Sequence, residues 1–105
     1  MAYTRFELRM EFLIKRKDGD WFDLHRDQFD ETLRPSSYLS KRVSGVGDHR
    51  IEFDGCEVLF SYEEPGILVS FECSDVPEDK AALIVEEIAK GVSAATGQDS
   101  IVVPL

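Results

Sequence analysis

The sequence predicts an α+β domain in which an antiparallel sheet of about five strands packs one face against a long helix near the C-terminus. Several segments alternate apolar and polar residues with a period of two, which is typical of strands buried on one face. One later segment repeats its apolar residues at spacings of three and four, which indicates an amphipathic helix. The chain of 105 residues fits a single domain over 1–105.

The first two strands are expected to form a hairpin. Residues 4–15 place apolar side chains at even positions and mostly charged ones at odd positions. A three-residue loop after them would pair Ile14 with Phe22 and Phe12 with Leu24, so that apolar residues face one another. Self-association through the first strand, giving a homodimer, is expected if that strand lies at an exposed edge of the sheet.

Segment 26–48 follows with a weaker pattern. Residues 26–33 predict a short helix that ends before Pro35, because proline disfavours helical geometry in the residue that precedes it. Residues 35–48 are rich in serine, glycine and charge, and this composition indicates a loop.

Residues 49–73 predict a meander of three strands. Asp54-Gly55 is a favoured pair for a two-residue hairpin turn. Pro65-Gly66 suits the central positions of a type II turn, which would place Cys73 opposite Val58. We therefore expect two reduced and buried thiols, because Cys56 and Cys73 then do not face each other.

The alternative turn at Glu64-Pro65 shifts the pairing by two residues. Cys56 would then lie opposite Cys73, within reach of a disulfide. The Pro65-Gly66 turn is preferred because it suits proline better.

The long helix is expected between a cap at Asp75 and a stop at Gly97. Pro77 suits its first turn, and the acidic residues that follow favour the positive end of the helix dipole. Residues 101–103 predict a last short strand that Pro104 closes.

Charge narrows the classes of partner. The net charge is −9, with a balance of +1 over residues 1–50 and −10 over residues 51–105. Such a chain should be repelled by nucleic acid and by anionic lipid, so a charged partner should be a basic protein. No stretch approaches the ~20 apolar residues of a membrane helix, and the N-terminus lacks the apolar run of a signal peptide, so we expect a cytoplasmic protein without membrane contact.

No catalytic, metal or cofactor motif is present in the sequence. The two histidines lack metal-ligand spacing, and the single GxG at Gly45 and Gly47 neither follows a confident strand nor opens a helix. We therefore expect no metal, no cofactor and no enzymatic activity.

The helix-free face of the meander is the surface that the sequence favours for binding. It combines two leucines with a rim of carboxylates, as protein-binding patches do. The predicted partner-binding residues are Glu52, Glu57, Leu59, Leu68 and Glu72. In one register Glu57 faces Glu72, and a cation or a partner would relieve that repulsion.

These features favour a small acidic interaction module that neutralises or escorts a basic partner. In size, charge and architecture alone the chain is similar to immunity proteins against nuclease toxins and to type III secretion chaperones, and no residue role carries over. The alternative is a small-ligand binder or enzyme with a pocket between the sheet and segment 26–48. Its candidate residues are Trp21, His25, Tyr38 and His49.

Overall fold

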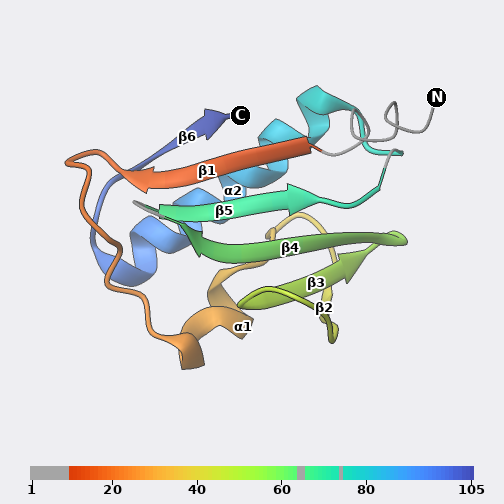
Figure 1. The fold of residues 1–105 in the computed structure, drawn as a ribbon, viewed down its shortest axis with the longest axis horizontal. Coiled ribbons are helices and arrows are strands. Elements are labelled where there is room, and N and C mark those ends of the chain that lie inside the picture. The colour runs from red at the N-terminus through yellow and green to blue at the C-terminus, as the bar shows by residue number, and fades with distance from the viewer. Residues whose placement is uncertain (1–9, 64–65, 74) are drawn as a thin grey trace.

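The sheet has six antiparallel strands in the order β2-β3-β4-β5-β1-β6, with helix α2 packed against one face (Figure 1). The computed structural model describes residues 10–63, 66–73 and 75–105. Its strands are β1 (Met10–Arg16), β2 (Lys41–Arg42), β3 (His49–Phe53), β4 (Cys56–Glu63), β5 (Gly66–Phe71) and β6 (Ser100–Pro104). Its helices are the 3₁₀ turn η2 (Arg26–Gln28), α1 (Phe29–Thr32) and α2 (Glu78–Thr96).

The α+β class and the long helix on one face of the sheet are confirmed. The short helix after residue 26, the three-strand meander and the final strand are also present. The first part of the predicted strand 4–15 lies outside the described residues. Strand β2 was not predicted, because two exposed basic residues carry no periodic signal.

The predicted hairpin between the first strand and residues 20–24 is wrong. Both sides of β1 are occupied by other strands, since Ile14 pairs with Ile67 of β5 and with Val102 of β6. Phe22 and Leu24 are still buried, but they belong to a segment that runs past the ends of the strands toward α1 (Figure 1). Phe22 and Leu24 are therefore buried, as their pattern indicated, but they do not pair with β1.

The register between β4 and β5 is the one that we did not prefer. Glu63 pairs with Gly66, so the connecting turn is Glu64-Pro65, whose own structure lies outside the described residues. Gly66 is needed for a close backbone contact rather than for a turn, because a Cβ on it would lie 2.3 Å from the carbonyl oxygen of Ile14.

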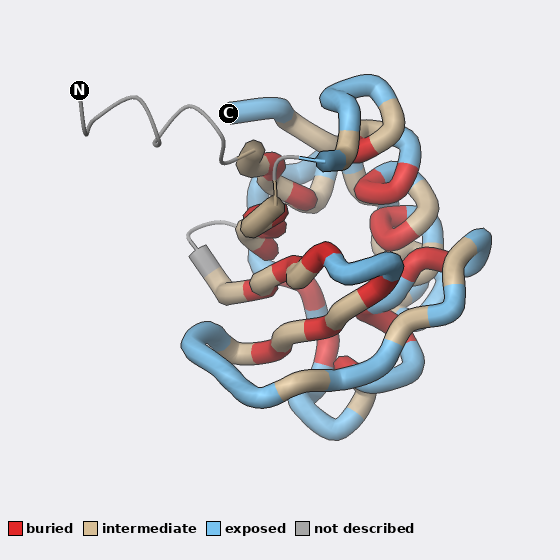
Figure 2. The backbone as a smooth tube through the Cα atoms, turned by 90° about the vertical axis from the view of Figure 1, so that its right-hand side faces the viewer, coloured by how far each residue is buried: buried red, intermediate tan, exposed pale blue. Residues whose placement is uncertain are grey.

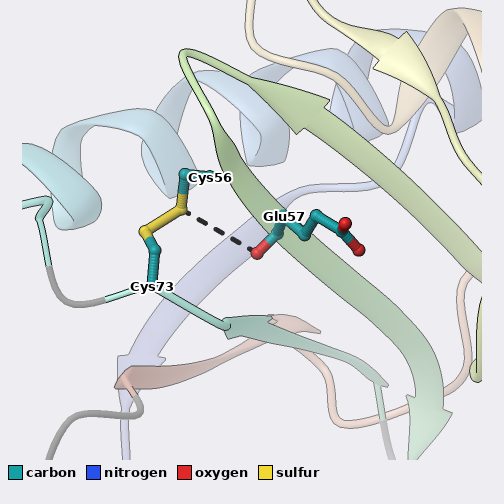
Figure 3. The surroundings of a disulfide bond; sticks show 3 residues. All are labelled: Cys56, Glu57 and Cys73. Carbon is teal, nitrogen blue, oxygen red and sulfur yellow. Dashed lines mark hydrogen bonds between the residues drawn. A yellow bond between two sulfur atoms is a disulfide. The ribbon is translucent and has the colours of Figure 1, made fainter.

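This register places Cys56 opposite Cys73, and the two form a disulfide with Cα atoms 5.4 Å apart (Figure 3). The expectation of two reduced thiols is therefore wrong in this structure. Cys56 is 2% exposed and belongs to the core, so the disulfide closes the inner side of the β4–β5 pair.

The core lies between the sheet and α2, as the buried residues of the two layers in Figure 2 show. Six residues of α2 face it: Ala81, Ile84, Val85, Ile88, Ala89 and Val92. Pro77 rather than Asp75 is the N-cap of α2, and Gly97 ends it in the left-handed conformation at φ 72°. Gly91 brings α2 close to α1, since a Cβ there would lie 3.4 Å from the carbonyl oxygen of Thr32.

We predict that the disulfide contributes about 3 kcal/mol to the free energy of unfolding, because it closes a loop of 17 residues in the unfolded chain. The double variant Cys56→Ala/Cys73→Ala should lose that amount in urea denaturation. Reductant should lower the stability of the native sequence and leave that of the double variant unchanged. Equal stabilities with and without reductant in the native sequence would contradict the disulfide.

Candidate interaction surface

The five residues predicted to bind a partner lie together on the face of the sheet opposite α2, which we call the outer face. Glu52 pairs with Glu57 between β3 and β4. Leu59 pairs with Ser70 and Leu68 pairs with Ser61 between β4 and β5. The strand pairing thus brings the predicted residues together, as the alternation indicated.

Leu13 of β1 belongs to the same face and was not among the predicted residues. It pairs with Leu68 on one side and with Val103 of β6 on the other. Leu13, Leu59 and Leu68 are all half-buried, and Leu13 lies opposite Leu68 while Leu59 lies diagonally from Leu68 on β4, so the three form an apolar row on the outer face. The sequence could not add Leu13 because the neighbour of β1 was unknown.

Arg50 supplies the cation that the facing carboxylates require. Glu57 and Glu72 lie opposite each other, as the hydrogen bond from the Glu72 N–H to the Glu57 carbonyl shows. The Arg50 Nε donates to Glu57 Oε1 at 2.6 Å, and its Nη2 donates to Glu72 Oε1. These bonds, led by the one to Glu57, raise the pKa of Arg50. The two carboxylates are therefore compensated within the chain and need no partner for that purpose.

The loop before β3 covers part of the outer face. The Tyr62 N–H donates to Asp48 Oδ2 at 2.8 Å, and the Asp48 N–H donates to the Phe60 carbonyl at 2.9 Å. A Cβ on Gly47 would lie 1.9 Å from Leu59 Cδ1, so the loop backbone rests on this leucine. Glu52, at the other end of the face, has Lys41 Nζ at 3.4 Å.

Ser70 lies in the middle of the outer face and is 1% exposed. Its Oγ has no hydrogen-bond partner among the described residues. Ser70 was not among the residues predicted to bind a partner.

The alternative pocket residues do not converge. The Trp21 ring packs against Tyr62 at 5.9 Å, whereas the Tyr38 ring lies 5.2 Å from Phe53 with Lys80 over it. His25 is exposed beside the first turn of η2. Only His49 enters the core, so these four residues do not line one cavity.

Side chains fill the space between α1 and the sheet, whereas a hollow open to solvent lies between residues 42–48 and β3 and is lined by His49 but by none of the other three candidates. Phe29 contacts His49 and Tyr62, with ring centroids 5.8 Å apart in each pair. A second hollow among the described residues, also open to solvent, lies between residues 31–39 and α2 and has Tyr38 in its lining. There the backbone N–H and the hydroxyl of Ser37 both donate to Glu87, and these bonds lower the pKa of Glu87.

His49 is 4% exposed, and its Nδ1 has no hydrogen bond in the described structure. Burial lowers the pKa of the imidazole, and Asp30, whose Oδ1 is 3.9 Å from Nδ1, opposes that shift in part. A neutral aromatic residue packed between Phe29 and Phe60 explains its position better than a catalytic role. Within the ranges that the structure describes, no group of three or more histidine, cysteine or acidic residues could hold a metal ion.

Comparison of the chain with protein-family models, with curated proteins and with solved structures found no match. None of the helices in the described part of the chain is both long and apolar enough to cross a membrane.

We predict that Arg50→Gln lowers the free energy of unfolding by about 1 to 2 kcal/mol, because it leaves two facing carboxylates without their shared charged donor. Adding Glu57→Gln to this variant should recover part of the loss. A double-mutant cycle measured by urea denaturation at low salt gives the coupling. Strictly additive effects of the two substitutions would contradict the bridging role of Arg50.

We predict that protonation of His49 destabilises the fold. The pKa of His49 is lower in the folded chain than in the unfolded chain. The stability that depends on a neutral His49 is therefore fully present above the ordinary imidazole pKa of about 6.5, and it is lost as pH falls toward the folded pKa. The free energy of unfolding should therefore decrease between about pH 7.5 and pH 5.5. His49→Phe should flatten this profile. A profile that is the same in the native chain and in this variant would refute the assignment.

Proposed function

We propose that this chain is a small protein-interaction module whose outer sheet face binds a basic protein partner and so neutralises or escorts it. The observation that carries the proposal is the row of half-buried leucines on a sheet face away from the helices. An apolar centre inside a polar rim is the usual anatomy of a protein interface. The rim here contains Glu52, Glu57 and Glu72 together with Arg50 and Lys41.

The preference for a basic partner rests on the charge of the whole molecule. Arg50 and Lys41 offset much of the local acidity, so the outer face alone is not strongly negative. The net charge of −9 creates a field that attracts a cationic protein and accelerates its encounter. Apolar contact would then supply most of the affinity, and charge would supply selectivity and speed.

A pocket enzyme or small-ligand binder receives less support, because the four candidate residues lie apart and line no common cavity. The absence of enzymatic activity stays a prediction. The cytoplasmic location also stays a prediction, and the oxidation state of Cys56 and Cys73 in cells tests it, since structural disulfides are rare in the reducing cytosol.

We predict that the immobilised chain captures a basic protein from native lysate, and that Leu59→Ser/Leu68→Ser loses it. The matched control is Leu39→Ser/Leu83→Ser, which makes the same change at leucines that are 93% and 69% exposed away from the outer face. Binding should weaken at high salt, because screening removes the long-range attraction. Thermal melts of both variants separate lost binding from lost folding.

A second pair of variants tests the rim. Glu52→Lys should weaken capture of the basic protein. Glu86→Lys, on the exposed side of α2, should weaken capture less, although both substitutions change the net charge by the same amount. Capture that is equal in the leucine variant and its control, or that depends on charge alone, would refute the outer face as the binding site.

A further inference from the structure

The two edges of the sheet differ in how they are protected. Edge strands expose unpaired backbone groups, and proteins usually blunt them with charge, short length, proline or bulges. Strand β2 is two residues long and consists of Lys41 and Arg42. Strand β6 has five residues, Ser-Ile-Val-Val-Pro, without any charge, and lies at the other edge beside β1. Pro104, at its end, is the one protective feature in its sequence.

Hydrogen bonds at both ends of β6 show which of its backbone groups point outward. The Lys17 N–H donates to the Asp99 carbonyl at 3.1 Å, and the Leu105 N–H donates to the Glu11 carbonyl at 3.0 Å. Because bonding alternates along an antiparallel pair, odd-numbered residues of β6 bond to β1. The N–H and C=O groups of Ser100 and Val102, and the C=O of Pro104, therefore face away from the sheet.

The outward N–H and C=O groups of β6 can pair with the same groups of a second β6. If a second copy of β6 runs antiparallel with Val102 opposite Val102, each Val102 N–H meets the Val102 carbonyl of the other copy. Each Ser100 N–H then meets the Pro104 carbonyl, while the missing N–H of proline is not required. Every outward donor of the strand finds an acceptor, and the five residues overlap completely.

The side chains favour the same register. Ile101, which is 38% exposed, would lie opposite Val103 of the second copy, so that apolar residues pair on the outer face. A register centred on Ile101 would instead place Val103 opposite the charged Asp99. On the inner face, Ser100 is already held by Ser93 and by the Ala89 carbonyl of α2. The side chains therefore select the Val102-centred pairing.

We propose that β6 is a homodimer interface, in which two copies of this chain join their sheets edge to edge about a two-fold axis at Val102. Such a contact is isologous and closes, so it yields dimers and no longer polymers. It involves a single short strand from each copy and should be weak compared with interfaces of standard size. The proposal uses a different surface from the proposed function and does not depend on it.

The first test is the mass in solution. Sedimentation of the native chain from about 10 µM to about 1 mM, a range suited to a small interface, should show mass rising from 11.9 kDa toward twice that value. Ile101→Lys/Val103→Lys should remain monomeric, because lysines then oppose lysines across the axis. Leu39→Lys/Leu83→Lys, which adds the same charge elsewhere, should dimerise as the native chain does. A monomeric native chain, or equal dimerisation of both variants, would overturn the proposal.

The second test fixes the register. Ile101→Cys and Val103→Cys, mixed as separate proteins, should form a disulfide between copies on mild oxidation, because these positions face each other in a closely spaced pair. Ile101→Cys alone should cross-link at least tenfold more slowly, since its own counterpart lies two residues away. Circular dichroism checks that both variants fold. Faster cross-linking of Ile101→Cys alone than of the mixture would refute the Val102-centred pairing.

Discussion

The carbonyl oxygen of Ile14 lies so close to Gly66 that any side chain at this position would collide with it. This contact ties the start of β5 to β1, and it fixes where β5 must begin. Once β5 begins at Gly66, the β4–β5 turn has two residues, Cys56 faces Cys73, and Glu57 faces Glu72. The disulfide and the Arg50 bridge are thus two consequences of one backbone contact, on opposite faces of the same strand pair. A register shift by two residues would remove both.

Features that depend only on residues close together in the sequence were predicted correctly. The alternation of β3, β4 and β5 identified both faces of each strand, and the Asp54-Gly55 turn has φ values of 53° and 78°, as its two-residue hairpin requires. The helix pattern identified the buried side of α2, because spacing alone sets which residues share a face. The five outer-face residues came together for the same reason.

The identity and register of neighbouring strands in the sheet could not be predicted in the same way. Ile14 pairs with Phe22 or with Ile67 equally well by apolar match, and only the three-dimensional packing decides between them. The turn preference of Pro65-Gly66 was a sound local argument, but Gly66 was needed for close approach to β1, a contact 52 residues away in sequence. The bridging role of Arg50 could not be predicted, since it exists only when β3, β4 and the residue after β5 lie side by side. The separation of Trp21, His25, Tyr38 and His49 could not be predicted for the same reason. The local sequence around each residue does not determine whether the four side chains meet in the folded chain.

The position of β1 also links the two proposed surfaces. Leu13 lies between Leu68 and Val103, so the apolar row of the outer face runs directly into β6. Joining two copies at β6 would extend that row across the two-fold axis and place two outer faces on one continuous sheet. A partner that contacts both copies would then gain affinity without any new contact within either site, because its second binding step becomes intramolecular. Dimerisation through β6 and binding of such a partner would therefore strengthen each other. By linkage, the free energy by which the bound partner stabilises the dimer equals the free energy by which dimerisation strengthens binding of the partner.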